Sequence, residues 1–241
     1  MAIFYVIPSC VLTQPWVCFC EMKTLSLIAL IASASLLSAE SLLNDLNKAQ
    51  LDQVVRGEQV VTMQDIPGNP WPRLKLYQRV HATPEEVAAV FFDYTNAKEY
   101  IPNVFKSDIS RHVTLSVVEV DFGIDIPLLP DEFYTVRNSL TAGRDGSYCV
   151  AWTLVRALQT KASEGSLQVE KFEEGAVLRY TNLVTPGSAM ARLLKLIAMK
   201  QMRNTVHAIV RQVEKQKREN PGALKQQVLS LQKALQKEAQ P

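Results

Sequence analysis

The stretch VHATPEEVAAVFFDYTNAKEYIPNV, residues 80–104, decides the fold. It follows residues 73–82, where apolar and polar side chains alternate as they do in a half-buried strand. Thr83 is a favourable helix N-cap, Pro84 suits the first helical position, and two glutamates follow in the first turn, where the helix dipole favours carboxylates. Apolar residues then recur at helical spacing as far as Phe91. The stretch therefore predicts a strand that leads directly into an amphipathic helix.

Six further strand candidates follow this helix, and short turns separate them. The turn at residues 143–146, GRDG, contains an Asp-Gly pair of the kind that closes hairpins. Consecutive strands are therefore expected to pair antiparallel, and with residues 73–82 they predict a curved antiparallel sheet of about seven strands. The candidates are residues 104–110, 113–122, 133–141, 147–157, 166–172 and 176–185.

A long helix is predicted after the sheet. Gly187 ends the last strand, Ser188 can cap the helix, and an apolar stripe then repeats every three or four residues as far as Val213. A helix of about 25 residues is long enough to cross a sheet. Together these elements indicate the α+β fold class. Beyond Asn220, the spacing typical of a coiled coil appears for fewer than two heptads, at Leu224, Val228, Leu231 and Leu235.

The N-terminal region indicates export. Lys23 is followed by an apolar run and then by small residues that end before Glu40, which is the pattern of a secretory signal peptide. Because a signal peptide begins at the initiator, we expect translation to start at Met22, and the protein to be secreted or periplasmic. A start at Met1, with residues 2–20 as an anchor, stays open. The predicted parts are an upstream over-extension (1–21), a signal peptide (22–39), an N-terminal helix, strand and proline-rich loop (40–72), the main domain (73–218) and a basic C-terminal helical tail (219–241).

Composition excludes several classes of protein. Hydrophobic residues make up 47% of the 241, so the chain is too apolar for a disordered protein, and the net charge of +2 gives no support for a nucleic-acid partner. The charge is divided unevenly, with 11 basic and 3 acidic residues in 187–241 but 14 and 20 in 40–186. The basic helices are therefore candidates for contact with a membrane surface, or else for ion pairs within the protein. Cys149 alone follows Met22, which leaves no pair for a disulfide.

Motifs for catalysis and for metals are missing from the sequence. It contains no glycine-rich phosphate loop, nucleophile elbow, His-Glu-x-x-His motif or paired-cysteine signature, so neither a metal nor a cofactor is expected. The spacing of His81, His112 and His207 does not make them converge. Glu119 and Asp121 share one face of a strand, where they could act as acid and base or simply be solvated.

The order of elements resembles the START-like (SRPBCC) superfamily, which includes polyketide cyclases and coenzyme Q-binding proteins. The similarity is closest at residues 82–92, with a small residue, a Pro-Glu-Glu helix start and an aromatic helix face, and in residues 93–102. It extends over roughly residues 74–217. The resemblance implies a helix-grip fold, in which the sheet wraps around the long C-terminal helix and encloses a cavity for a hydrophobic ligand. The signal peptide, the N-terminal helix and the basic tail depart from the family pattern.

Candidate ligand-binding residues come from the strands and helices that would surround this cavity. Trp152 shares a strand face with Val150 and Leu154, and aromatic side chains are typical of ligand pockets. Arg137 and Arg179 stand in otherwise apolar strands, and an arginine inside a cavity would need the polar head of a ligand as partner. The candidates are Phe91, Tyr134, Arg137, Trp152, Arg179, Tyr180, Met190 and Leu194.

The sequence thus predicts a secreted or periplasmic protein that holds a hydrophobic small molecule or lipid without changing it chemically. Residues 123–130, which are apolar for a loop, are expected to open beside the final helix. Two alternatives stay open. One is a cyclase-like or hydrolase-like enzyme with Glu119 or Asp121 as base. The other is an interaction module in which the basic tail, from Gly187 onward, recruits a partner or dimerises through Leu224, Val228, Leu231 and Leu235. The oligomeric state is not predicted.

Overall fold

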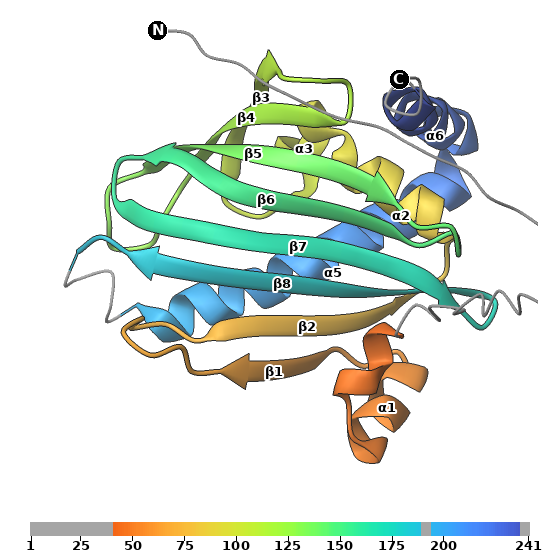
Figure 1. Cartoon of the computed structure of the whole chain (residues 1–241), viewed down its shortest axis with the longest axis horizontal. Helices are drawn as coiled ribbons and strands as arrows, with labels where there is room; N and C mark the ends of the chain where they lie inside the picture. The colour runs from red at the N-terminus through yellow and green to blue at the C-terminus, as the bar shows by residue number, and fades with distance from the viewer. Residues whose placement is uncertain (1–40, 189–193, 237–241) are drawn as a thin grey trace, which may run out of the picture. The chain divides into compact units, whose positions relative to one another are not determined.

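In the computed structural model, which describes residues 41–188 and 194–236, eight strands form one antiparallel sheet in the order β1-β2-β8-β7-β6-β5-β4-β3 (Figure 1). These residues belong to one compact unit, Ala39–Pro241. The strands are β1 (Val60–Gln64), β2 (Arg73–Val80), β3 (Val104–His112), β4 (Val117–Ile124), β5 (Glu132–Ala142), β6 (Tyr148–Ala157), β7 (Thr160–Phe172) and β8 (Gly175–Pro186).

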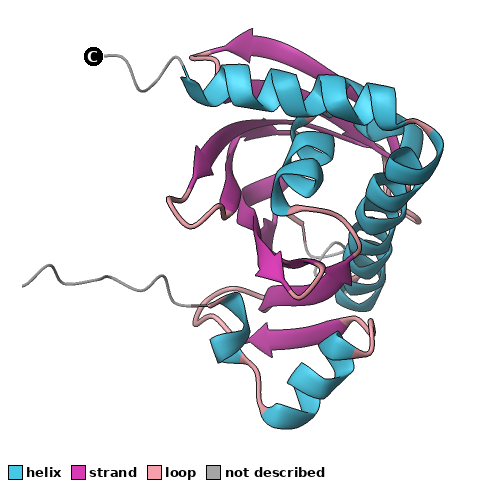
Figure 2. Cartoon of the chain, turned by 90° about the vertical axis from the view of Figure 1, so that its right-hand side faces the viewer, coloured by secondary structure: helices cyan, strands magenta, loops and turns pink. Residues whose placement is uncertain are grey.

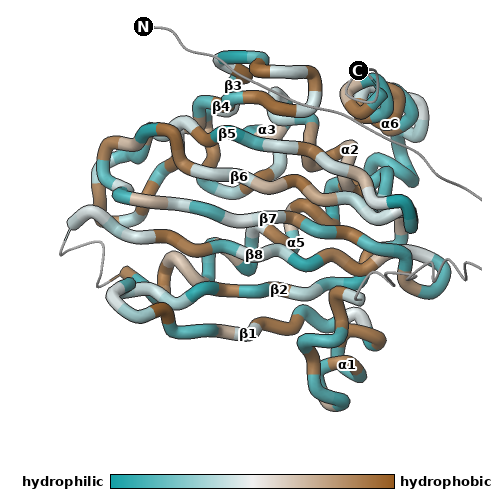
Figure 3. Tube along the Cα trace, viewed as in Figure 1, coloured by the Kyte–Doolittle hydropathy of each residue, from teal (hydrophilic) through white to brown (hydrophobic). Residues whose placement is uncertain are grey.

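The connections follow the predicted meander. Strands β3 to β8 pair with their neighbours in sequence, and β8 then pairs with β2, so the sheet stays open with β1 and β3 at its edges. The antiparallel sheet and the α+β class are confirmed. The eighth strand is β1, whose Val60 pairs with Tyr77, so the segment before the proline-rich loop extends the sheet beyond the predicted domain start. Figure 3 shows hydrophobic and hydrophilic residues alternating along the strands.

The segment after β2 folds as its sequence predicts. Helix α2 (Pro84–Phe92) begins with a capping box, in which Glu86 N donates to Thr83 Oγ1 at 3.2 Å and Thr83 N donates to Glu86 Oε2 at 2.8 Å. Val87 and Val90 turn into the core beneath the sheet. A short 3-10 helix, η2 (Tyr94–Asn96), and α3 (Ala97–Tyr100) complete the excursion to β3.

Two helices end the described chain. The long helix α5 (Lys195–Glu219) crosses the inner face of the sheet, and the strands curve around it (Figure 2). Helix α6 (Pro221–Gln236) turns back against α2 and the inner face of β4 to β6. None of the described helices is both long enough and apolar enough to span a membrane.

The tail leucines pack inside the molecule. Leu224 and Leu231 are buried, and the α6 cluster includes Val118, Leu140 and Val150 of the sheet. Dimerisation through this stripe is therefore wrong as a prediction, because spacing shows that a helix face is apolar but not which surface covers it. The partner of α6 is its own sheet.

The segment before β1 lies on the opposite, outer face of the sheet. It consists of η1 (Leu42–Asp45) and α1 (Lys48–Val55), which contact β7, β8 and β2. Val54 is fully buried there in a cluster with Tyr77. The outer face is therefore partly covered by this N-terminal segment, and the inner face by α2, α5 and α6.

Candidate functional site

A cavity of about 270 Å³ lies between the inner face of the sheet and the first half of α5. Its walls are mainly apolar, and α2, the α3 region and the loop between β4 and β5 complete them. Aromatic side chains from four strands and one helix point into it, namely Phe91, Phe122, Tyr134, Trp152 and Tyr180.

The register of α5 explains why a cavity forms here. Residues that face it follow helical spacing, at 194, 197, 198, 201, 202 and 205. The same stripe continues with Val206, Ile209 and Val213, but these side chains are fully buried in the core. The cavity therefore occupies the space into which the core would otherwise extend along the helix.

Trp152 is fixed by the residues around it. A side-chain carbon at Gly165, which pairs with Trp152, would collide with the indole ring and with the Thr181 carbonyl oxygen, so the ring occupies the place of a missing side chain. The Trp152 ring centroid lies 5.1 Å from that of Tyr180 and 6.2 Å from that of Phe91. These contacts hold an aromatic wall in one geometry.

The polar groups on the sheet side of the cavity include two buried amides, Asn138 and Asn182, and one carboxylate, Glu132, at the start of β5. Asn182 and Asn138 are buried and lie on either side of the Gly165–Trp152 pair in the register. Burial raises the pKa of both Tyr134 and Tyr180 well above the usual range, so both hydroxyls are protonated at neutral pH.

Loops border one end of the cavity, at the left of Figure 1. This loop end consists of residues 125–131 between β4 and β5, residues 158–159 between β6 and β7, and residues 194–196 at the start of α5. Gln159 joins the first two of these segments, because its Nε2 donates to Pro130 O at 2.9 Å. Its carbonyl accepts from Gly187 N, directly after β8, at 2.8 Å. Residues 125–130 thus lie beside the cavity.

Five of the eight predicted ligand-binding residues line the cavity: Phe91, Tyr134, Trp152, Tyr180 and Leu194. The structure brings these five side chains together around one cavity. Met190 lies in residues 189–193, outside the described part of the chain.

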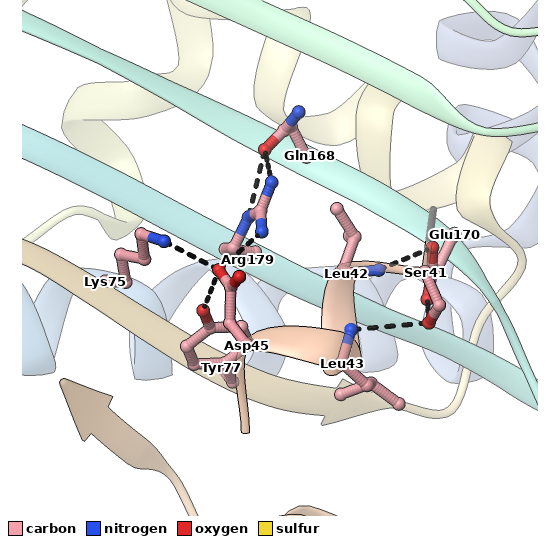
Figure 4. A network of polar contacts seen from close by, with 9 residues as sticks. All are labelled: Ser41, Leu42, Leu43, Asp45, Lys75, Tyr77, Gln168, Glu170 and Arg179. Carbon is pink, nitrogen blue, oxygen red and sulfur yellow. Dashed lines mark hydrogen bonds and ion pairs between the residues drawn. The ribbon is translucent and has the colours of Figure 1, made fainter. Parts of the chain in front are cut away.

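The two predicted arginines do not line the cavity. Arg137 lies on the outer face, where its Nη2 is 2.7 Å from Glu119 Oε1. Arg179 is on the same face, where it donates to Gln168 Oε1 and to Asp45 Oδ2 (Figure 4). The physical reason is strand alternation: Val136 and Tyr180 point inward, so the residues next to them point outward.

The predicted catalytic carboxylates also face away from the cavity. Glu119 is held by Arg137, and Asp121 accepts a hydrogen bond from Thr135 Oγ1 at 2.6 Å. That bond, with a smaller contribution from Arg156, lowers the pKa of Asp121. Within the described residues, no three histidine, cysteine or acidic side chains gather as a metal site would require. The cyclase hypothesis therefore loses the two bases that the sequence offered.

Several cavity residues were missed from the sequence. Phe122, Asn182 and Met202 all line the wall. Phe122 and Asn182 follow from period-two alternation, and Met202 from the same helical stripe as Leu194. The contribution of Tyr94 and Ile101 could not be inferred, because they reach the cavity through the folding of the α2–α3 excursion.

Comparison with known proteins gives matches in structure. No protein-family model and no curated protein matches the sequence. Among solved structures, a STAR-related lipid transfer protein from Xanthomonas axonopodis is similar, with a TM-score of 0.59, 16% identity, and coverage of 65% of this chain and 93% of that one. The Zhui aromatase/cyclase from Streptomyces sp. R1128 has a TM-score of 0.55 at 16% identity, covering 62% of this chain and 98% of its own. Human STARD10 has a TM-score of 0.54 at 15% identity, covering 68% and 74%. The chain therefore has the START-like helix-grip fold.

Proposed function

We propose that this protein binds a hydrophobic small molecule or lipid in the cavity between the sheet and α5 and releases it unchanged. The observation that carries the proposal is a mainly apolar cavity of about 270 Å³ placed where the core would otherwise continue. Burial of apolar ligand surface would supply the binding free energy at about 25 cal/mol per Å². The STAR-related lipid transfer protein among the structural matches supports this choice.

We expect the ligand to pass through the loop end. Three of the most exposed large apolar side chains of the described residues lie there, Leu128 at 84%, Leu158 at 72% and Leu196 at 76% exposure. Lys195 and Lys200 flank Leu196 on α5. Exposed leucines beside cationic groups suit contact with an anionic membrane surface, from which a lipid can be extracted. The same proposal includes export of the protein: a signal peptide directs it to the periplasm or the exterior and is then removed.

Native mass spectrometry of the purified protein tests ligand binding. The expected spectrum contains a discrete added mass, which solvent extraction releases as a lipid or another hydrophobic molecule. A bare protein mass that stays bare after incubation with a lipid mixture would contradict the proposal. The same spectrum gives the mass of the mature chain, and a mass that still includes residues 22–39 would contradict cleavage of the signal peptide.

A charge inside the cavity is expected to abolish uptake. Trp152→Glu places a carboxylate in the aromatic wall, where desolvation and loss of ring contacts oppose an apolar ligand. Thr153→Glu, one residue further along β6 and exposed on the outer face, is the matched control and should keep full uptake. Both variants are checked for native circular dichroism. Unchanged uptake in a folded Trp152→Glu protein would rule out this cavity as the binding site.

A further inference from the structure

Asn182 has an incomplete set of hydrogen bonds. Its side chain is on the inner face of β8, lines the cavity and is 9% exposed. Nδ2 donates to Met202 Sδ at 3.6 Å, and a thioether is a weak acceptor. Oδ1 is buried and has no hydrogen-bond partner. Because an unpaired buried amide is costly, the structure leaves a polar group that a ligand can satisfy.

The surroundings of Asn182 are apolar and aromatic. It pairs with Gly165 on β7, and the Trp152 ring covers that glycine, so the indole lies beside the amide. Tyr180 is two residues away on the same strand face and packs against Trp152. A molecule that lies along the aromatic wall can therefore place one polar group at Asn182 and keep the rest of its surface in apolar contact.

The charges around the cavity disfavour an anion. Among the described lining residues, the charged ones are Asp125 and Glu132, and both are acidic. Glu132 is 1% exposed and accepts from Leu158 N at 2.9 Å and Gln159 N at 3.0 Å. A carboxylate or phosphate of a ligand would lose its hydration here and find no cationic partner on the described wall, which is unfavourable.

We propose that the cavity selects an uncharged lipid alcohol, whose hydroxyl group hydrogen-bonds the Asn182 amide. This inference rests on the proposed function. A hydroxyl both donates and accepts, so it pairs with the amide in either orientation of its oxygen and nitrogen. The volume, about 270 Å³, lies just below the range for small-molecule pockets, roughly 300–1,000 Å³, which favours one compact chain over two acyl chains.

A series of ligands with one chain length and different head groups tests this proposal. Dodecanol, dodecanoate and dodecane are compared for binding to the delipidated wild-type protein at about pH 8, where the acid is ionised. Dodecanol is expected to bind about tenfold more tightly than either of the others, since only it satisfies the amide without burying a charge. Dodecanoate binding as tightly as dodecanol overturns the charge argument, and dodecane binding as tightly overturns the hydrogen bond. Binding of none of the three contradicts the proposed function itself.

Two matched variants locate the hydrogen bond. Asn182→Leu should remove the preference for dodecanol over dodecane while dodecane still binds, because the apolar wall stays. Thr181→Leu introduces the same side chain at the neighbouring position of β8, on the outer face and away from the cavity, and should keep the preference. Both proteins must retain native circular dichroism. A preference that persists in Asn182→Leu, or that disappears in Thr181→Leu alone, overturns the assignment to Asn182.

Discussion

At the residue scale, Gly165 determines where Trp152 lies. Its strand neighbours carry ordinary side chains, but a Cβ at this position would meet the indole ring and the Thr181 carbonyl oxygen. The glycine is thus required for the space it leaves rather than for its backbone conformation. The aromatic wall of the cavity depends on this one small residue.

Gly165→Ala is expected to lower the free energy of unfolding by about 1–3 kcal/mol, as overpacking does, and to push the indole into the cavity. Urea denaturation measures the stability, and titration with dodecanol measures the reduced affinity. Gly222→Ala is the control, because no heavy atom lies within 4 Å of the added carbon and alanine favours the helix. If Gly165→Ala were as stable as Gly222→Ala, with unchanged affinity, the packing argument would be wrong.

At the scale of elements, the N-terminal segment is anchored to the outer face by polar contacts (Figure 4). Asp45 Oδ2 accepts from Lys75 Nζ at 2.6 Å, Arg179 Nη1 at 2.9 Å and Tyr77 Oη at 3.0 Å. The hydrogen bond from Lys75, with smaller contributions from Tyr77 and Arg179, lowers the pKa of Asp45. Burial, together with Asp45, raises the pKa of Tyr77 to about 12. Ser41 and the Leu42 amide form a second anchor on Glu170.

Acid is expected to loosen this segment. Because the folded pKa of Asp45 lies below its unfolded value of about 3.9, its contribution is complete above that value and is lost as pH falls through the folded pKa. Asp45→Asn should reproduce the loss at neutral pH and increase amide exchange in residues 42–55 about fivefold, equivalent to about 1 kcal/mol. Hydrogen exchange with mass spectrometry measures this. Unchanged exchange in the variant would show that apolar contacts alone hold the segment.

Helix α6 contributes to the core of the same molecule. Leu231 is 1% exposed among sheet side chains, whereas Leu229 on the same helix is 38% exposed. Leu231→Ala should reduce the free energy of unfolding by about 2–4 kcal/mol, and Leu229→Ala should change it far less. Light scattering should give the same molar mass for both variants as for the wild type. A Leu231→Ala protein that dissociates from dimer to monomer would restore the interaction-module hypothesis.

The whole molecule has its apolar loop end and helix α6 at opposite ends of α5 (Figure 1). Part of the basic charge of the C-terminal helices forms ion pairs within the protein, since Lys217 Nζ lies 2.8 Å from Glu86 Oε2. The lysines near the start of α5 lie instead beside the exposed leucines of the loop end. For the proposed membrane contact, this arrangement favours the loop end over the tail as the docking surface.

Leu158→Asp combined with Leu196→Asp should slow extraction of dodecanol from vesicles of phosphatidylcholine and phosphatidylglycerol about tenfold, because apolar contact with the membrane is lost. Equilibrium affinity in solution should stay the same. The control is Leu115→Asp, an exposed leucine in the turn between β3 and β4. Equal slowing by Leu115→Asp would show a general charge effect and contradict docking through the loop end.

Much of this architecture could be predicted from the sequence, because local signals specify it. The capping residues at Thr83, the turn at residues 143–146 and the stripe on α5 each fix an element without reference to the rest. The addition of β1 to the sheet and the docking of α6 depend on contacts between distant segments, which no local sequence pattern predicts.

Within the candidate site too, local sequence patterns predict some residues and miss those that depend on distant contacts. Strand alternation alone predicts that Trp152 and Tyr180 line the cavity, and it places Arg179 on the outer face. Arg179 was predicted as a cavity residue because of its charge, against the strand geometry. The unsatisfied oxygen of Asn182 was not predictable, because it depends on what α5 places opposite the strand.

The continuous stripe on α5 has a consequence for the life of the protein in the cell. If a ligand fills the place where the core would continue, it stabilises the folded chain by about 2.7 kcal/mol at a hundredfold excess over its Kd. Unoccupied molecules then unfold more often and are degraded sooner by proteases. We expect the abundance of this protein to rise and fall with the supply of its ligand, so that cells starved of the ligand also lose its carrier.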